Sequence, residues 1–224
     1  MSTFQQQIFK AIKSTAVSRS VASVLTLFGH FYLANSLGKE AMGIIAMISI
    51  FFGFFDVFLS VGFSQALVQK KSLSKTQQST LYWLNVVLGI SLSLMVFIGA
   101  RYLACFLNQL NLVVIFKIYS LIIFTNSISI QFKALAEKRL SFTYIAWLHF
   151  SIASVNLITT ILYVLLIEPS VMAFVSGYVL SNLVKNFAYL AYGIRNKLLP
   201  SFVFSLSESI DLLTFGLLFF KIKK

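Results

Sequence analysis

Acidic residues are scarce in this sequence, which has six Asp and Glu against 18 Lys and Arg. All charged residues together make up only 11% of the 224 residues, whereas a soluble domain usually carries about 25%. Hydrophobic residues make up 58% of the chain, and the mean hydropathy is +0.89. So few charged side chains cannot cover a water-facing surface. The composition therefore argues against an ordinary soluble domain and indicates a surface that faces lipid.

Cysteine and histidine are almost absent. Cys105 is the single cysteine, which excludes an internal disulfide and a cysteine-based metal site. His30 and His149 lie in separate apolar runs without metal-ligand spacing, so we interpret them as packing residues, with a proton relay as the alternative. The sequence also lacks a Gly-rich phosphate loop and paired carboxylates at a useful spacing. We therefore expect no metal, no cofactor and no catalytic residues, and a protein that is not an enzyme.

The excess of basic residues does not point to nucleic acid. Binding of a phosphate backbone needs an exposed basic face. Here the Lys and Arg residues lie mostly in short breaks between apolar runs, where they carry information about membrane topology. We therefore expect no nucleic-acid partner.

Long apolar runs dominate the chain. A membrane-spanning helix needs about 20 mostly apolar residues. Six segments meet this requirement, at 20–37, 41–68, 80–100, 112–132, 142–167 and 171–194. The sequence predicts an all-α fold, a polytopic transmembrane bundle of about six spanning helices over 20–194. We expect a cytoplasmic N-terminal segment at 1–19, and a cytoplasmic loop with the truncated start of a seventh helix at 195–224.

The breaks between the apolar runs alternate in charge. Eleven basic residues fall in the N-terminal tail and in the breaks at 70–75, 133–139 and 195–197. The other breaks hold only two basic residues, Lys39 and Arg101. Because cytoplasmic loops carry the excess of Lys and Arg, this pattern places the N-terminus in the cytoplasm.

Polar side chains recur within each predicted span at intervals of three or four, which places them on one face of a helix. Small polar residues and glycines on such a face are mostly explained by close packing of helices. A charged side chain is different, because placing it at the middle of the membrane costs about 2.5–3.5 kcal/mol on insertion scales. Asp56 and Lys185 lie near the middle of the second and sixth spans. They either form an ion pair between helices or line an aqueous cavity.

Lys117 lies about a turn and a half into the fourth span, where it either reaches the membrane interface or faces the cavity. Arg19 begins the polar face of the first span, and Asn182 and Tyr189 share the polar face of Lys185. The complete set of candidates for the lining of a substrate-binding cavity is Arg19, Asp56, Lys117, Asn182, Lys185 and Tyr189.

Several stretches are similar to one known family of membrane proteins. They are LGKEAMGIIAM at 37–47, GFSQALVQK at 62–70, STLYWLN at 79–85, KALAEKRLSF at 133–142 and the segment 204–216. In order and spacing they resemble the polysaccharide transporter family of Wzx-type O-antigen flippases. That family is a branch of the multidrug/oligosaccharidyl-lipid/polysaccharide exporter superfamily. The resemblance covers essentially the whole chain and corresponds to the N-terminal half of the family.

The resemblance implies a bacterial inner-membrane protein in which two helical bundles alternate between inward-open and outward-open states. The implied cargo is an undecaprenyl-diphosphate-linked oligosaccharide, such as a repeat unit of O-antigen, capsule or exopolysaccharide. Arg19, Lys117 and Lys185 would then face the diphosphate, and Tyr189 would stack on sugars. The implied partners are this lipid-linked oligosaccharide, membrane lipids, and a second helical bundle or polysaccharide assembly proteins.

Two alternative functions stay open at this point. One is a drug or metabolite antiporter of the same superfamily. The other is a non-transporting remnant or a partner subunit of another membrane protein. Because the resemblance stops inside the seventh helix, we expect a truncated form of the transporter.

Overall fold

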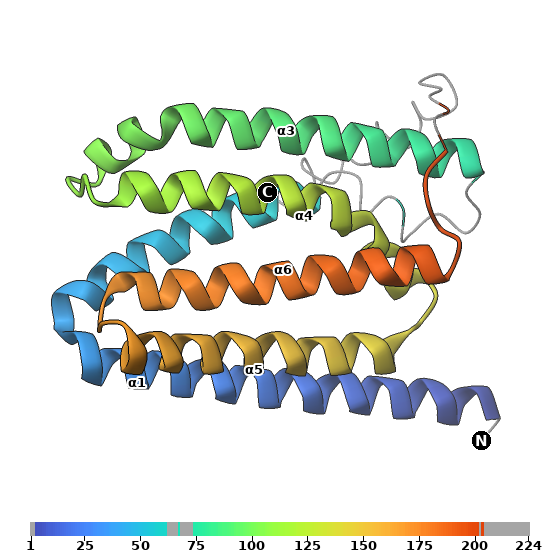
Figure 1. Ribbon diagram of the computed structural model, residues 1–224. Helices are drawn as coiled ribbons and strands as arrows, with labels where there is room; N and C mark the ends of the chain where they lie inside the picture. Colours follow the sequence, from blue (N-terminus) through green and yellow to red (C-terminus); the bar gives the residue numbers. More distant parts are fainter. Residues whose placement is uncertain (1–2, 62–66, 68–73, 202, 204–224) are drawn as a thin grey trace, which may run out of the picture. The chain divides into compact units, whose positions relative to one another are not determined.

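The computed structural model describes residues 3–61, 67, 74–201 and 203. Within these residues there are five long helices and no strand (Figure 1). The helices are α1 (Thr3–Val61), α3 (Lys75–Phe106), α4 (Leu112–Lys138), α5 (Phe142–Leu166) and α6 (Val171–Arg195). The predicted all-α fold is confirmed.

A break at Gly38 divides α1 into two arms. Gly38 has φ 79° and ψ 179°, a backbone conformation that a residue with a Cβ atom rarely adopts. The break falls between the first two predicted spans, at 20–37 and 41–68. A single glycine therefore separates two helices, which are the two arms of α1.

Four of the described helices are long and apolar enough to cross a membrane, judged by length and composition. They are α1 (over Thr15–Leu59), α3, α4 and α5. The fifth helix, α6, is not among the four, although it has 25 residues; it carries Asn182, Lys185 and Asn186 in its middle. With the two arms of α1 counted separately, the helices correspond to the six predicted segments. The protein is a multi-pass helical membrane protein.

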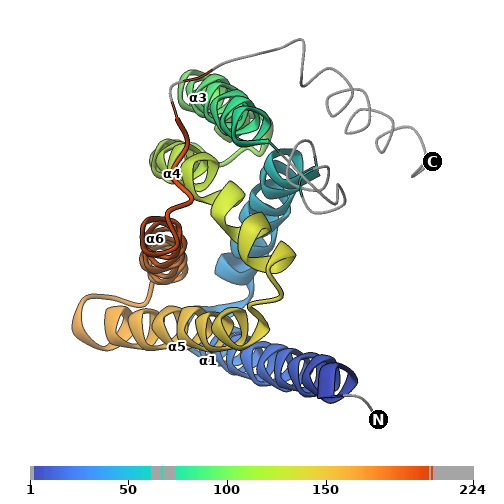
Figure 2. The same cartoon turned by 90° about the vertical axis from the view of Figure 1, so that its right-hand side faces the viewer.

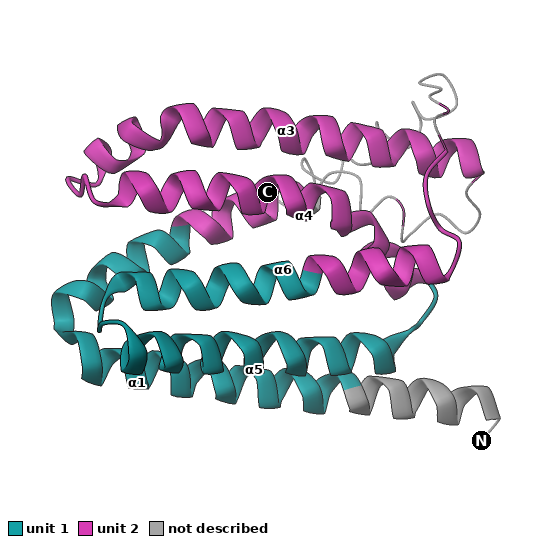
Figure 3. Ribbon diagram, viewed as in Figure 1, with its two compact units in different colours: residues 1–50, 139–185 teal, residues 51–138, 186–224 magenta. Residues whose placement is uncertain are grey.

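The chain divides into two compact units, shown in different colours in Figure 3. Unit 1 comprises Met1–Ile50 and Arg139–Lys185. Unit 2 comprises Phe51–Lys138 and Asn186–Lys224. Because the boundaries fall inside α1 and α6, each of these helices contributes one part to each unit.

In unit 1, α5 packs against the first arm of α1 (Figures 1 and 2). The contact is close at Gly29, where an added Cβ would lie 3.4 Å from Leu157 Cδ1. The first part of α6 approaches α5 closely at Gly177. A Cβ there would overlap the Thr160 hydroxyl and lie 2.8 Å from the Asn156 carbonyl oxygen. Small residues thus allow the helices to pack closely.

In unit 2, α3 and α4 form an antiparallel hairpin. Gly89 of α3 lies directly against Ser127 of α4, where an added Cβ would overlap the serine side chain. One turn further along α3, the Ser93 hydroxyl donates a hydrogen bond to the Ser120 carbonyl oxygen at 2.7 Å. Small residues of both helices therefore form this interface.

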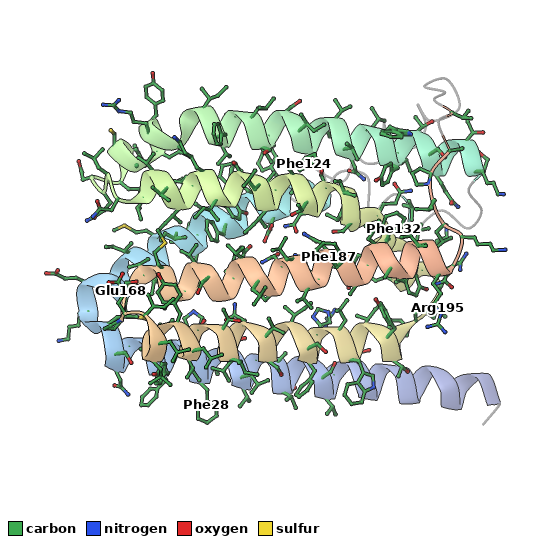
Figure 4. All side chains as sticks on the ribbon, viewed as in Figure 1. Phe28, Phe124, Phe132, Glu168, Phe187 and Arg195 are labelled. Atoms are coloured by element: carbon green, nitrogen blue, oxygen red, sulfur yellow. The ribbon has the colours of Figure 1, made fainter. Side chains whose placement is uncertain are left out.

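The last part of α6 packs against α4 in the same unit. An added Cβ on Gly193 would lie 2.5 Å from Phe132 Cδ1. The outward faces of the helices carry large apolar side chains. Phe28 is 63% exposed and Phe187 is 69% exposed (Figure 4). Exposed phenylalanines on long apolar helices suit a surface that faces lipid.

Candidate functional site

Five residues of unit 2 form a hydrogen-bonded polar cluster among apolar helices. Asn126 of α4 donates from Nδ2 to Asp56 Oδ1 at 3.3 Å. Asn186 of α6 donates from Nδ2 to Asn126 Oδ1 at 2.9 Å and to Thr125 Oγ1 at 3.0 Å. The Ser129 hydroxyl donates to Asn186 Oδ1 at 2.6 Å. These residues, called the polar cluster below, link α1, α4 and α6.

The hydrogen bonds of the polar cluster share one direction. Ser129 donates to Asn186, Asn186 to Asn126, and Asn126 to Asp56. Hydrogen bonds in a chain polarise one another, so donors that all point one way strengthen the last donor. The chain ends at a carboxyl group, which is suited to accept. The arrangement therefore stabilises a polar acidic side chain within the predicted second span.

Tyr119 of α4 joins the polar cluster to the second arm of α1. Its hydroxyl donates to the Phe52 carbonyl oxygen at 2.7 Å and lies 3.5 Å from Asp56 Oδ1. The Phe52 and Tyr119 rings stack, with their centroids 3.8 Å apart. Tyr119 is fully buried. The tyrosine thereby fixes the helix that carries Asp56 against α4.

A second polar group lies in unit 1, on α6. Lys185 Nζ donates to Asn182 Oδ1 one turn earlier on the same helix. Asn182 is 6% exposed, and its Nδ2 donates to the Tyr178 carbonyl oxygen at 2.8 Å. Lys185 itself is half-buried. The structure thus brings two of the predicted cavity residues together and places a positive charge in the middle of a helix.

The structure assigns Asp56 and Lys185 to different units, each with its own hydrogen-bonding neighbours. Their ion pair stays a prediction. The same holds for the shared cavity that the six candidate residues were expected to line.

The other three candidates have different surroundings. Lys117 is exposed on α4, with Nζ 5.4 Å from the centroid of the Phe97 ring, a cation–π geometry. Arg19 is exposed on α1 and makes no hydrogen bond with the described part of the chain. Tyr189 of α6 is 2% exposed. Cavity roles for these three residues stay predictions.

Of the polar cluster, only Asp56 was among the candidate residues predicted from the sequence. On α4, the polar residues Ser120, Ser127 and Gln131 all contact α3. Asn126 lies on another side of the same helix, toward Asp56 and Asn186. Asparagine within a long apolar run was the available signal, because its amide needs hydrogen-bond partners that lipid cannot supply.

The family described as "Polysaccharide biosynthesis protein" matches residues 32–223, which include both polar groups. The chain belongs to this family. This confirms the resemblance to polysaccharide transporters noted from the sequence. The match begins within the first arm of α1 and covers all later helices.

Three curated relatives are similar to this chain. Teichuronic acid biosynthesis protein TuaB of Bacillus subtilis is 26% identical over 218 residues, covering 96% of this chain and 44% of TuaB. Lipopolysaccharide biosynthesis protein WzxC of Escherichia coli is 25% identical over 214 residues, covering 96% and 43%. An uncharacterized membrane protein in the cps region of Klebsiella pneumoniae is 28% identical over 136 residues, covering 59% and 28%.

The chain spans less than half the length of these relatives. No solved structure matches it.

Proposed function

We propose that this chain acts in polysaccharide biosynthesis by moving a lipid-linked oligosaccharide across the bacterial inner membrane. The cargo would be a sugar repeat unit on undecaprenyl diphosphate, carried from the cytoplasmic to the periplasmic leaflet. Two relatives support the choice of pathway, since TuaB is named for teichuronic acid and WzxC for lipopolysaccharide biosynthesis.

The observation that carries the proposal is the Lys185–Asn182 pair on α6. A lysine within a membrane-spanning helix is costly, and such residues commonly mark the path of a polar or charged substrate. An ammonium group and amides are the groups that a diphosphate and sugar hydroxyls would contact. Three of the six predicted cavity residues, Arg19, Lys117 and Lys185, are basic and one, Asp56, is acidic. This balance favours an anionic cargo over the cationic cargo expected of a drug antiporter.

Replacing Lys185 with Met tests this function. The change keeps most of the side-chain length but removes the charge and the bond to Asn182. In cells whose surface polysaccharide depends on this protein, we expect at least about a tenfold loss of polymer, because a contact with a charged group is worth roughly 1.5–3 kcal/mol. The measurement is surface polysaccharide by immunoblot, together with the amount of protein in the membrane.

Lys39→Met is the matched control, because Lys39 is exposed beside the break in α1. It should leave the polymer unchanged, and Lys185→Arg should retain most of it. Normal polymer in Lys185→Met cells with normal protein levels would refute the role of Lys185 in transport.

The topology also follows from charge and can be tested separately. In unit 2, Lys75 and Lys138 lie at the helix ends away from the α3–α4 turn, whereas that turn is preceded only by Arg101. We expect alkaline phosphatase fused at Asn108 to be active, and green fluorescent protein fused at Leu140 to fluoresce. Alkaline phosphatase activity from a fusion at Leu140 would reverse the proposed orientation.

A further inference from the structure

Two basic residues lie near the turn between α3 and α4, on the exposed surface of unit 2. Arg101 comes shortly before the end of α3 at Phe106, and Lys117 comes shortly after the start of α4 at Leu112. At a rise of 1.5 Å per residue, each is about 7.5 Å from the end of its helix. Because the helices form an antiparallel hairpin, the two residues lie at similar depths near the same end of the hairpin.

A ring contact places the two basic side chains on one face of the hairpin. Lys117 Nζ lies 5.4 Å from the centroid of the Phe97 ring on α3. Arg101 follows Phe97 by four residues, so these two side chains share a face of α3. The cation–π contact therefore holds the Lys117 ammonium group on the face that carries Arg101.

Neither basic residue has an anionic partner in the described part of the chain. Arg101 makes no hydrogen bond or ion pair there, and the contact of Lys117 is with an aromatic ring. The sequence from 75 to 136, which covers α3 and nearly all of α4, contains no Asp or Glu. Lys39, by contrast, is followed directly by Glu40. Charged side chains on membrane-spanning helices are costly and usually paired. A neighbouring molecule in the membrane can supply the missing counter-charge.

The apolar surroundings of the two cations point to a lipid. On α3, Ile98 and Leu94 precede Arg101 by one and two turns and are 71% and 54% exposed. On α4, Leu121 follows Lys117 by one turn and is 62% exposed. These side chains extend from the cations toward the middle of the hairpin. Acyl chains would cover this apolar surface, while a phosphate group would contact both cations. A small soluble anion would leave the apolar surface uncovered.

The exposure of the two cations favours an abundant lipid over a rare one. A contact between one basic residue and an anionic lipid strengthens binding only about fivefold. Two such contacts on an open surface retain a lipid only where that lipid is plentiful in the leaflet. Bulk anionic phospholipid meets this condition, and a carrier lipid present in small amounts does not.

We propose that Arg101 and Lys117 together bind the phosphodiester of an anionic phospholipid such as phosphatidylglycerol, with its acyl chains along the apolar faces of α3 and α4. The charge pattern assigns this end of the hairpin to the periplasmic side, so the lipid belongs to that leaflet. For Lys117 this is the interface position rather than the cavity. Lipid binding here does not depend on the proposed transport function.

Native mass spectrometry tests this site. The full chain is purified in detergent and titrated with phosphatidylglycerol or with phosphatidylcholine, and the bound lipids are counted. We expect one phosphatidylglycerol to bind about 25-fold more tightly than phosphatidylcholine. Arg101→Met and Lys117→Met should each weaken phosphatidylglycerol about fivefold, and the double variant about 25-fold. Binding of phosphatidylcholine should not change, because the variants keep the apolar surface.

Lys39→Met is the matched control. It also removes an exposed lysine on the turn side of the membrane, but one that has Glu40 beside it, so phosphatidylglycerol binding should stay the same. Arg101→Lys keeps the charge and should retain most of the affinity. Thermal unfolding of each variant checks that the protein remains folded.

Three outcomes would overturn the proposal. Equal affinity for the two phospholipids, or an unchanged affinity for phosphatidylglycerol in the double variant, would show only bulk lipid contact. Two tightly bound phosphatidylglycerol molecules, each lost with one of the single variants, would show that Arg101 and Lys117 do not share a lipid. Displacement of phosphatidylglycerol from the wild-type chain by a lower concentration of undecaprenyl phosphate would assign the site to a carrier lipid instead.

Discussion

Replacing Gly89 with Leu is expected to force α3 away from α4 and to leave little folded protein in the membrane. An added Cβ would overlap the Ser127 side chain and lie 3.5 Å from its Cα. The overlap is with the serine Cβ atom, which no rotation of the side chain can move. Helices of membrane proteins depend on such close approaches for their packing. Overpacking a tight site costs about 1–3 kcal/mol of stability. We expect a leucine at this position to cost at least the upper value of this range.

The measurement is the yield and thermal unfolding of the purified protein, followed by size-exclusion chromatography after heating. Gly99→Leu is the matched control on the same helix, because an added Cβ at Gly99 has nothing within 4 Å. Gly99→Leu should retain near-normal yield. Removing the opposing side chain provides a rescue, since Gly89→Ala destabilises alone but should recover when combined with Ser127→Gly. If Gly89→Leu unfolds at the same temperature as Gly99→Leu, α3 and α4 do not pack closely at Gly89.

The helices were largely predictable because length and hydropathy determine them. Apolar runs of about 20 residues identify the membrane-spanning segments. The exact form of the break at Gly38 was not predictable in the same way. In the structure Gly38 alone makes the break, because Lys39 and Glu40 already belong to the second arm. Charge beside a glycine marks where a helix can break, but not how many residues the break takes.

The hydrogen-bonding partners within the membrane were less predictable, for a physical reason. A helix of polar and small residues can present several faces, and spacing alone does not say which neighbour each face meets. On α4, Ser127 faces α3 while Asn126, the adjacent residue, faces Asp56. Lys185 and Asn182 were predictable as a pair because they are three residues apart on one helix. Contacts between helices distant in sequence required the structure.

The polar cluster depends on Asn186 more than on any other member. Its amide makes three of the bonds of the cluster, to Thr125, Asn126 and Ser129. The Thr125 hydroxyl donates to a carbonyl oxygen of α4, and the Ser129 hydroxyl lies 3.2 Å from the Asn126 carbonyl oxygen, to which it can turn, so each keeps a partner if Asn186 is removed. The Asn126 Oδ1 atom has no such second partner among the described residues. Loss of Asn186 would therefore leave a buried amide oxygen unpaired next to Asp56.

Asn186→Leu is accordingly expected to lower the free energy of unfolding by about 2–4 kcal/mol. Hydrogen bonds in membrane proteins average about 0.6 kcal/mol in double-mutant cycles, and an unpaired buried group adds roughly 1–3 kcal/mol. Steric trapping or denaturant unfolding in bicelles would measure the change. Asn196→Leu is the control, since the Asn196 amide donates to the Tyr192 carbonyl oxygen, one turn earlier in the chain.

A double-mutant cycle with Asn126→Leu separates the bond from the loss of each side chain alone. Coupling of about 0.6–1.7 kcal/mol is expected between Asn126 and Asn186, because each is the partner of the other. The double variant should lose less free energy of unfolding than the two single variants lose together, since it leaves neither amide unpaired. Strictly additive losses would show that the Asn126–Asn186 bond contributes nothing to stability. An Asn186→Leu variant as stable as Asn196→Leu would show that the cluster does not join α4 to α6.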